Sequence, residues 1–476
     1  MAERPAVPRT PANAGRGKGP QFKGNARRGE SQEIGVSLAP PPTVRKLQAA
    51  LHAKAKEAPT YRFYALHDKL YREDVLEHAY LRCKANRGAA GVDGVSFEDI
   101  ELAGREEWLG ALAKEVKQKI YRPNAVRRVY IPKPNGKQRP LGIPTIRDRV
   151  VQMAAVLVLE PIFEADLPPE QYAYRPDHSA LDAVQAVHRL LNTGHTEVVD
   201  ADLSGYYDSI PHAELMKSVA RRVSDRHLLH LVTMWLEAPV EETDRRGHAH
   251  RTTRNRDTGR GTPQGAPLSP LLSNLYMRRF VLGWKTFGCE ERLDAHIVNY
   301  ADDFVICCRG TAEEAERTMR ALMARLKLTV NDEKTRVCHL PDECFDFLGY
   351  TIGRCYSPQT GRAYVGTLPS KTRVQRICQD VRERTAPRWT WRDAGDLVGD
   401  LNRRLRGWAN YFILGPVSKA YRAVDSHVKK QLRQWLCRKH KKRGRGTARY
   451  PDKYLYETLG LIRLPSLTRH LPWANA

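Results

Sequence analysis

Three aspartates stand at the ends of short apolar segments. Asp302 and Asp303 interrupt the stretch HIVNYADDFVICC (296–308), whose flanking residues are apolar enough to form two buried strands joined by a tight turn. Asp202 follows another apolar segment, EVVDAD (197–202). Like charges at the tip of a buried hairpin are unfavourable unless a positive charge lies close by. The pattern therefore predicts a cation at this tip.

The chemistry that three such carboxylates suit is nucleotidyl transfer. If the strand before Asp202 neighbours the hairpin in one sheet, the three side chains meet at one edge. Oxygen ligands of this kind suit Mg²⁺. Two divalent cations ~4 Å apart are how polymerases activate a hydroxyl and stabilise the leaving pyrophosphate. We therefore interpret Asp202, Asp302 and Asp303 as ligands of two Mg²⁺ ions, although two aspartates on a surface turn are commoner than a catalytic hairpin.

The composition favours a nucleic-acid partner. The chain has 476 residues, with 79 Lys and Arg against 54 Asp and Glu, which gives a net charge of +25. An excess of this size favours a polyanion, with nucleic acid ahead of an anionic membrane surface. No apolar run is long enough for a membrane span, and the polar, proline-rich start lacks a signal core. We expect a protein of the cytoplasm or nucleoid.

The nine cysteines are scattered, and no two of them form a C-x-x-C pair. This spacing predicts neither a zinc ribbon nor a cysteine-ligated nuclease module. Several cysteines lie in apolar runs, so we expect reduced core residues and no disulfide framework.

The expected elements mix helices and strands without a regular alternation, as is typical of an α+β fold. We expect helices within 44–84 and over 147–163 and 312–326, a glycine-rich loop over 86–100, a hairpin over 126–144, and a strand leading into a helix over 196–210. From about residue 367 the chain becomes helical and strongly basic. There, arginine and lysine alternate with tryptophan, which offers charge for phosphates and planes for bases.

Several motifs follow one another in a fixed order. They are IPKPNGKQRPLGIP (131–144), DLSGYYDSIPH (202–212), GTPQGAPLSPLLSNLYM (261–277), YADD (300–303), LTVNDEKT (328–335) and FDFLGY (345–350). Over about residues 75–355 this succession resembles the reverse transcriptases encoded by group II introns. LNRRLRGWANYF (401–412) is similar to the maturase, or thumb, signature of that family, and YLYETLGLIRLPSL (454–467) to its C-terminal end.

The resemblance implies an α+β right-hand polymerase with fingers, a palm built on an antiparallel sheet, and a helical thumb. The segments it implies are a disordered basic tail (1–45), an RNA-binding N-terminal extension of the fingers (46–110), fingers and palm (111–360), the thumb or maturase domain (361–436), and a short basic DNA-binding region without an HNH endonuclease (437–476).

The resemblance also assigns roles to single residues. Asp202, Asp302 and Asp303 match the family's metal-binding carboxylates, with the Leu203 carbonyl as a further ligand. The nucleotide-binding positions that it implies are Lys133 and Arg139, which would hold the triphosphate, and Pro263 and Gln264, which would line the nucleotide pocket. Tyr207 would lie under the sugar and discriminate against a 2′-hydroxyl. Lys334 would donate a proton to the pyrophosphate. The nucleic-acid-binding positions are Arg175 near the template and Arg404, Arg406, Trp408, Lys429 and Lys430 in the basic helices.

The resulting hypothesis is an RNA-directed DNA polymerase and maturase that binds group II intron RNA, aids its splicing, and copies it into DNA at a target site. Its partners would be intron RNA, a DNA target or primer and dNTPs, with no membrane, and it would act as a monomer or homodimer. The alternatives are an RNA-binding splicing factor with an inactive polymerase domain, a reverse transcriptase recruited to defence, CRISPR or retron-type synthesis, and a template-independent or repair polymerase on the same fold.

Overall fold

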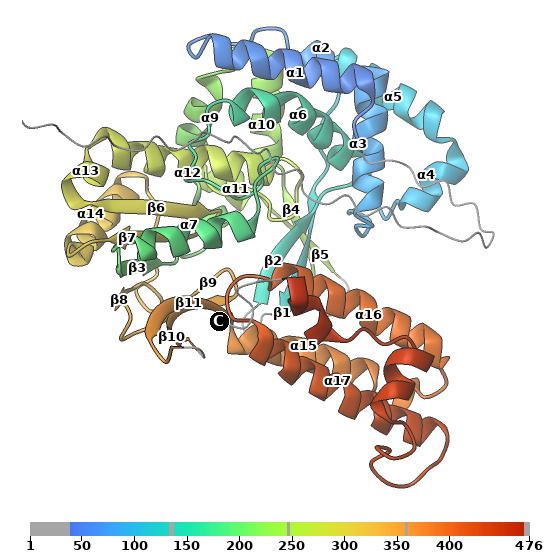
Figure 1. Cartoon of the computed structure of the whole chain (residues 1–476). Coiled ribbons are helices and arrows are strands. Elements are labelled where there is room, and N and C mark those ends of the chain that lie inside the picture. The colour runs from blue at the N-terminus through green and yellow to red at the C-terminus, as the bar shows by residue number, and fades with distance from the viewer. Residues whose placement is uncertain (1–38, 133–137, 245–247, 358–359, 471–476) are drawn as a thin grey trace, which may run out of the picture. The chain divides into compact units, whose positions relative to one another are not determined.

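The computed structural model describes residues 39–132, 138–244, 248–357 and 360–470 (Figure 1). The α-helices are α1 (Pro42–Glu57), α2 (His67–Leu70), α3 (Glu73–Ala85), α4 (Phe97–Ala103), α5 (Arg105–Lys117), α6 (Ile146–Glu164), α7 (Ala180–Asn192), α8 (Tyr206–Ser209), α9 (His212–Ala220), α10 (Arg226–Leu236), α11 (Arg254–Thr258), α12 (Ser269–Thr286), α13 (Cys289–Leu293), α14 (Ala312–Arg325), α15 (Lys371–Arg384), α16 (Ala394–Tyr411) and α17 (Ser418–Lys439). The strands are β1 (Val126–Pro132), β2 (Gln138–Ile143), β3 (Glu197–Ala201), β4 (Val240–Thr243), β5 (Ala249–Thr252), β6 (Ala295–Tyr300), β7 (Asp303–Cys308), β8 (Arg336–His339), β9 (Phe345–Phe347), β10 (Tyr350–Tyr356) and β11 (Ala363–Pro369). Short helical turns form η1 (Pro387–Trp389), η2 (Tyr454–Thr458) and η3 (Leu464–His470).

The elements agree with the expected mixture of helices and strands. The predicted hairpin over 126–144 is the antiparallel pair β1 and β2, and the predicted helices over 147–163 and 312–326 are α6 and α14. α6 begins where the pattern places it because the Thr145 side chain caps it by accepting a hydrogen bond from the Asp148 amide. The tip of the β1–β2 hairpin, which includes Lys133, lies outside the described residues.

The sheet that carries the YADD motif has the order β6-β7-β3-β8, and all its pairs are antiparallel. β7 is an inner strand and is buried on both faces. Phe304 and Ile306 point into one apolar core, with residues of α12 and α14, while Val305 points into a second core with residues of α7. Side chains alternate along a strand, so a continuously apolar sequence such as FVICC fits a strand covered on both faces.

Two further sheets accompany it. One has the order β2-β1-β4-β5, in which β1 pairs with β4 in parallel and the other pairs are antiparallel, and the other has the order β11-β10-β9. Together with the helices they give a mixed α+β fold, as expected from the sequence.

The basic segment after residue 370 folds into the helices α15, α16 and α17, which share one apolar core. On α16 the buried residues Leu397, Leu401, Leu405 and Trp408 recur every three or four positions and form one stripe. The exposed positions between them include Arg403, Arg404 and Arg406. The periodicity therefore turns the apolar side inward and leaves arginines on the surface.

All nine cysteines are free, and seven of them are buried, in agreement with the expectation of reduced core residues. Within the part of the chain that the structure describes, none of the helices has the length and apolar character needed to cross a membrane.

Candidate active site

The three aspartates of the predicted metal site meet at one end of the β6-β7-β3-β8 sheet. Asp303 is the first residue of β7, Asp302 lies in the turn before it, and Asp202 directly follows β3. β3 and β7 run antiparallel with Ala201 opposite Phe304, so the end of one strand adjoins the start of the other. The β6–β7 turn is tight because Ala301 adopts a φ of 60°, a left-handed conformation that two-residue hairpin turns require.

Negative charge exceeds positive charge at this end, where Asp200, Asp202, Asp302 and Asp303 face Lys334 and Arg336. Desolvation, together with the nearby Asp302, Asp202 and Asp200 carboxylates, raises the pKa of Asp303 to about 6. Desolvation likewise raises the pKa of Asp200, which the sequence reasoning did not single out, to about 6. A set of oxygen ligands whose negative charges raise one another's pKa fits divalent cations.

Asn331, Lys334 and Thr335 hold Asp202 in place. The Lys334 ammonium and the Asn331 side-chain amide each donate a hydrogen bond of 3.0 Å to Asp202 Oδ2. The Asn331 backbone amide donates to the Asp202 carbonyl (2.8 Å), and the Asp202 amide donates to the Thr335 hydroxyl (3.3 Å). The adjoining bridge between Leu203 and Val330 uses the Asp202 carbonyl and the Ser204 amide. It leaves out the Leu203 carbonyl, the predicted further ligand.

Two pockets flank the aspartate pair. One, of 530 Å³, brings together Arg139, Tyr207, Gln264 and Asp302, residues from four separate motifs. The other, of 450 Å³, is lined by Asp202, Asp303 and Lys334 together with Asp200, Arg336 and Asp346. The structure thus gathers most of the predicted metal and nucleotide residues around one turn.

The wall of the first pocket depends on a close backbone approach. Gly265 has a φ of 112°, and a Cβ there would lie 2.7 Å from the Gly142 carbonyl oxygen. The Gly142 amide in turn donates to the Gln264 carbonyl at 2.7 Å. Pro263 shapes the same turn, because its carbonyl accepts a hydrogen bond from the Ser269 hydroxyl at the start of α12 (2.8 Å). Glycine is required at 265, because any side chain would displace β2.

The tyrosine pair that follows Asp202 divides into a core residue and a pocket residue. Tyr206 is fully buried, and its hydroxyl donates to the Ser273 carbonyl at 2.7 Å. Tyr207 lines the 530 Å³ pocket, and its hydroxyl donates to that of Tyr174 at 3.2 Å. The geometry therefore separates two adjacent tyrosines that the sequence alone left ambiguous.

Arg175 has a structural position in place of the expected template contact. Its side chain is 7% exposed and pairs with Glu164 at 2.7 Å. It also donates to the carbonyls of Pro168 and Gln171. All its donor groups face protein acceptors, so this guanidinium braces a loop, and the template contact stays a prediction without support from the structure.

The predicted nucleic-acid residues of the basic helices fall into two groups. Arg406 and Lys430 are exposed. Lys429 is held by Asp425 and Asp452 at 3.5 and 3.0 Å. Trp408 is 9% exposed, with its ring centroid 5.2 Å from that of Phe412. The tryptophan therefore packs mainly in the core and is far less exposed than Arg406 and Lys430.

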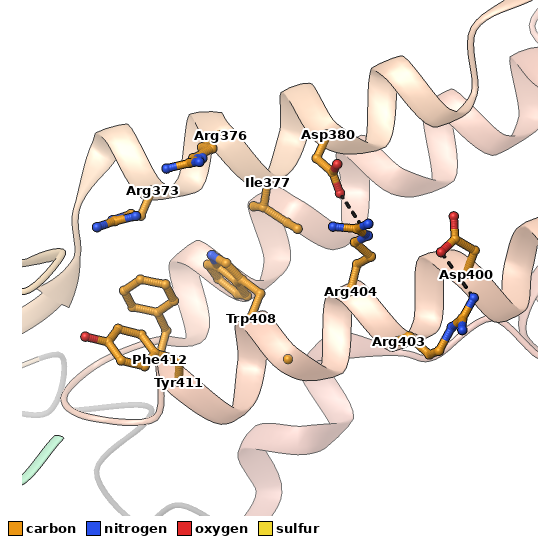
Figure 2. A pocket seen from close by; sticks show the side chains of 11 residues that line it. Arg373, Arg376, Ile377, Asp380, Asp400, Arg403, Arg404, Trp408, Tyr411 and Phe412 are labelled. Carbon is orange, nitrogen blue, oxygen red and sulfur yellow. Dashed lines mark hydrogen bonds and ion pairs between the residues drawn. The ribbon is translucent and has the colours of Figure 1, made fainter. Parts of the chain in front are cut away.

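A pocket of 970 Å³ opens between α15 and α16 (Figure 2). Its lining includes Arg373 and Arg376 of α15, Arg403 and Arg404 of α16, and the aromatic residues Trp408, Tyr411 and Phe412. Two acids also line it: Arg404 lies 3.7 Å from Asp380, and Arg403 lies 3.3 Å from Asp400. Of the predicted nucleic-acid-binding residues, Arg404 and Trp408 line this pocket.

Two residues of the active site were missed by sequence reasoning. Asp200 precedes Asp202 by two positions, so strand periodicity could have placed both on one side. Asn331 lies three residues before Lys334 in VNDEKT, but nothing local in the sequence indicates its bond to Asp202, 129 residues away.

Comparison with known proteins is consistent with this site. A family model described as reverse transcriptase (RNA-dependent DNA polymerase) matches residues 131–352, and one described as group II intron, maturase-specific domain, matches residues 374–454. Protein YkfC of Escherichia coli is 32% identical over 392 residues, covering 75% of this chain and 99% of that protein. The group II intron-encoded protein LtrA of Lactococcus lactis is 28% identical over 352 residues, covering 61% of this chain and 57% of LtrA. A putative COX1/OXI3 intron 1 protein of Saccharomyces cerevisiae is 26% identical over 329 residues, covering 59% of this chain and 38% of that protein.

The fold, the carboxylates and these matches place the chain among RNA-directed DNA polymerases. More particularly, it belongs to the family of reverse transcriptases encoded by group II introns, in which a polymerase domain is followed by a maturase domain. The chain spans nearly the whole of the E. coli relative but just over half of the Lactococcus relative.

Proposed function

We propose that this protein binds group II intron RNA, assists its splicing, and copies it into DNA during retrohoming, with two Mg²⁺ ions at Asp202, Asp302 and Asp303. The observation that carries the proposal is the convergence of these three aspartates at one end of a sheet, beside a pocket lined by Arg139, Tyr207 and Gln264. The Leu203 carbonyl would complete the set of oxygen ligands.

When bound, Mg²⁺ supplies positive charge for the attacking 3′-hydroxyl and for the phosphates of the nucleotide. The protein's own residues do the positioning. Arg139 lies on β2 in the wall of the 530 Å³ pocket, where its guanidinium can hold phosphate oxygens in a two-pronged contact. Lys133 is proposed for the same task and lies outside the described residues. Gln264 offers an amide to the nucleotide in the same pocket.

Tyr207 and Lys334 are proposed to control selectivity and proton transfer. The Tyr207 ring lines the nucleotide pocket and is held by its hydroxyl contact to Tyr174, so it can present a fixed surface to the sugar and exclude a 2′-hydroxyl. Lys334 Nζ lies in hydrogen-bond contact with Asp202. From there the ammonium can transfer a proton to the leaving pyrophosphate as a general acid.

The fingers, palm and thumb of the proposed right hand follow the chain. The fingers would comprise residues 46–110, as an RNA-binding extension, and the β1–β2 hairpin. The β6-β7-β3-β8 sheet would form the palm, and α15–α17 the thumb, whose exposed Arg404, Arg406 and Lys430 are available to phosphates. The partners are intron RNA, a DNA primer or target and dNTPs. The working form would be a monomer or homodimer in a cytoplasmic or nucleoid-bound ribonucleoprotein.

The test is primer extension by the purified protein on an RNA template with a DNA primer, dNTPs and Mg²⁺. Asp302→Ala should abolish extension but leave RNA binding intact, because the carboxylate repels phosphate until a cation is bound. Asp332→Ala is the matched control, since Asp332 is a surface aspartate 83% exposed. RNA binding without extension by the unaltered chain would leave only the splicing role, which self-splicing of a group II intron with and without the protein measures separately.

A further inference from the structure

A compact group of two histidines and one aspartate lies at the opposite end of the sheet from the catalytic aspartates. His195 stands two residues before β3, Asp294 directly before β6, and His296 within β6. Antiparallel pairing puts the start of β3 and the start of β6 beside the end of β7, at Cys308. Five residues of strand separate this end from the catalytic end, about 15–20 Å. The group is therefore distinct from the active site.

The three residues offer ligand atoms that are close together. One atom from each of His195, Asp294 and His296 lies within 4.8 Å of the others. Nε2 of His195 is 3.0 Å from Asp294 Oδ1, and Nε2 of His296 is 3.6 Å from that same oxygen. The two rings lie 4.8 Å apart between centroids. Both imidazoles thus turn the same nitrogen toward one carboxylate oxygen.

The other nitrogen of each ring is oriented by an acceptor. The Thr193 hydroxyl donates its hydrogen to the Leu190 carbonyl (2.8 Å), so toward His195 Nδ1, 3.1 Å away, it can only accept. The Leu190 carbonyl also lies 3.2 Å from that nitrogen. His296 Nδ1 faces the Glu290 carboxylate at 2.9 Å. Both Nδ1 atoms therefore face acceptors to which they can donate, and Nε2 of each ring is the nitrogen directed at Asp294.

This arrangement matches the surroundings of histidines that bind metals. Such histidines present one nitrogen to the ion and donate the other to a carbonyl or carboxylate, which fixes the tautomer. Here Leu190 and Glu290 serve as those acceptors. Positive charge has to lie between these two nitrogens and the carboxylate oxygen, either as a proton on each ring or as a bound cation. One divalent ion can replace two ring protons without changing the net charge.

We propose that His195 Nε2, His296 Nε2 and an Asp294 carboxylate oxygen form a binding site for a divalent transition-metal ion, with Zn²⁺ as the first candidate. Nitrogen and carboxylate donors suit Zn²⁺, and three protein ligands leave a fourth position for water. Water has access, because the side chains of Asp294 and His296 are 46% and 31% exposed. Arg309, which directly follows β7, holds the other Asp294 oxygen at 3.4 Å. The ion would thus join the starts of β3 and β6, two strands whose other ends adjoin the catalytic aspartates.

The test is Zn²⁺ binding to the full chain, by competition with a chromophoric chelator in excess Mg²⁺. The Asp302→Ala chain is tested alongside, so that ions at the catalytic aspartates are not counted. One Zn²⁺ per chain is expected for both proteins, with affinity lowered at least tenfold in His296→Gln and Asp294→Asn. The matched control is His339→Gln, which removes a lone histidine at the same sheet end, 3.8 Å from Glu197 and Glu313. Unchanged affinity in His296→Gln, or equal loss in His339→Gln, overturns the proposal.

A second measurement guards against variants that bind poorly only because they are misfolded. Co²⁺ replaces Zn²⁺ in such sites and reports its ligands by absorption. His296→Cys should retain the ion and add a thiolate-to-cobalt charge-transfer band that the unaltered chain lacks. Absence of that band in a variant with an unchanged circular dichroism spectrum shows that residue 296 is not a ligand, and the site is then an ion-paired cluster of protonated histidines. Neither measurement depends on polymerase activity.

Discussion

Lys334 Nζ donates a hydrogen bond of 3.0 Å to Asp202 Oδ2, although 132 residues separate the two in sequence. The side chain of Lys334 is 58% exposed and lines the same 450 Å³ pocket as Asp202 and Asp303. A cation so placed can hold the carboxylate in position before a nucleotide arrives and can face the phosphates afterward. Two roles follow for Lys334, charge balance and proton donation, and they predict different behaviour of its variants.

Lys334→Ala should lower the maximal rate of nucleotide addition by about 10²-fold, the usual contribution of a general acid. Lys334→Arg keeps the charge but does not give up a proton, so it should be nearly as slow while binding dNTP normally. Single-turnover extension over a range of dNTP concentrations separates the maximal rate of nucleotide addition from the dissociation constant for dNTP. The control is Lys327→Ala, which removes an exposed lysine paired with Glu214 at 2.6 Å. Wild-type rates in Lys334→Arg would mean that charge alone matters.

Asp303→Asn should abolish extension yet stabilise the metal-free fold. The pKa of Asp303 is raised to about 6 in the folded protein, against about 3.9 in an unfolded chain. Ionisation therefore costs folding free energy above about pH 6, and the cost vanishes below about pH 4, where the group is protonated in both states. Allowing for solvent screening, the variant should gain on the order of 1 kcal/mol at pH 7.

Urea unfolding in EDTA measures the difference in free energy of unfolding between Asp303→Asn and the unaltered chain. The difference should be present at pH 7 and absent at pH 4. The matched control is Asp332→Asn, because Asp332 is a surface carboxylate 2.6 Å from Arg320. Its removal should change the free energy of unfolding by no more than about 0.5 kcal/mol. A variant Asp303→Asn that is less stable than the unaltered chain at pH 7 contradicts the excess of negative charge inferred at this sheet end.

Gly265→Ala should disturb the nucleotide pocket through the backbone. The new Cβ would lie 2.7 Å from the Gly142 carbonyl oxygen, and residue 265 has a φ of 112°. The turn that contains residue 265 must therefore move away from β2. We expect a loss of about 1–3 kcal/mol of stability and a raised KM for dNTP. Gly310→Ala is the matched control, since Gly310 has a φ of 73° but nothing within 4 Å of the new Cβ. Equal effects of both substitutions would show that backbone strain alone is responsible.

Sequence reasoning reached the parts of the site that local patterns encode. Apolar segments before Asp202 and around Asp302 predicted short buried strands, and antiparallel pairing of those strands is what brings the carboxylates together. The PQG turn with Gly265 and the β1–β2 hairpin were likewise predictable, because turn residues have fixed conformational preferences.

What the sequence could not supply are contacts between distant segments. The pairing of Tyr207 with Tyr174, of Asn331 with Asp202 and of Arg175 with Glu164 depends on tertiary packing, and no periodicity reports it. For the same reason the sequence suggested that the Trp408 ring could stack on a base, whereas the structure places it in the buried apolar stripe of α16. A motif's basic or aromatic residues show what a segment contains but not which side chains face outward.

Arg175→Gln should act on stability and leave template binding unchanged. Breaking a buried ion pair leaves the partner charge uncompensated, so the loss of the 2.7 Å pair with Glu164 should cost about 3 kcal/mol or more. Adding Glu164→Gln removes the stranded charge and should recover part of that cost. Thermal unfolding of the single and double variants, with RNA-template affinity measured on each folded protein, tests both statements. A fall in template affinity without a loss of stability would restore the template contact predicted from the sequence.

Tyr207→Ala should relax sugar discrimination, because it removes the ring that lines the nucleotide pocket. Incorporation of a ribonucleotide relative to the deoxynucleotide should rise about tenfold or more, as measured by the ratio of the two kcat/KM values. Tyr207→Phe keeps the ring and loses only the contact to Tyr174, so it should retain discrimination. The neighbouring Tyr206→Phe should instead cost about 1 kcal/mol of stability, since its hydroxyl donates to the Ser273 carbonyl, with no change in sugar selectivity. Relaxed selectivity in Tyr206→Phe but not in Tyr207→Ala would reverse the assignment of the two rings.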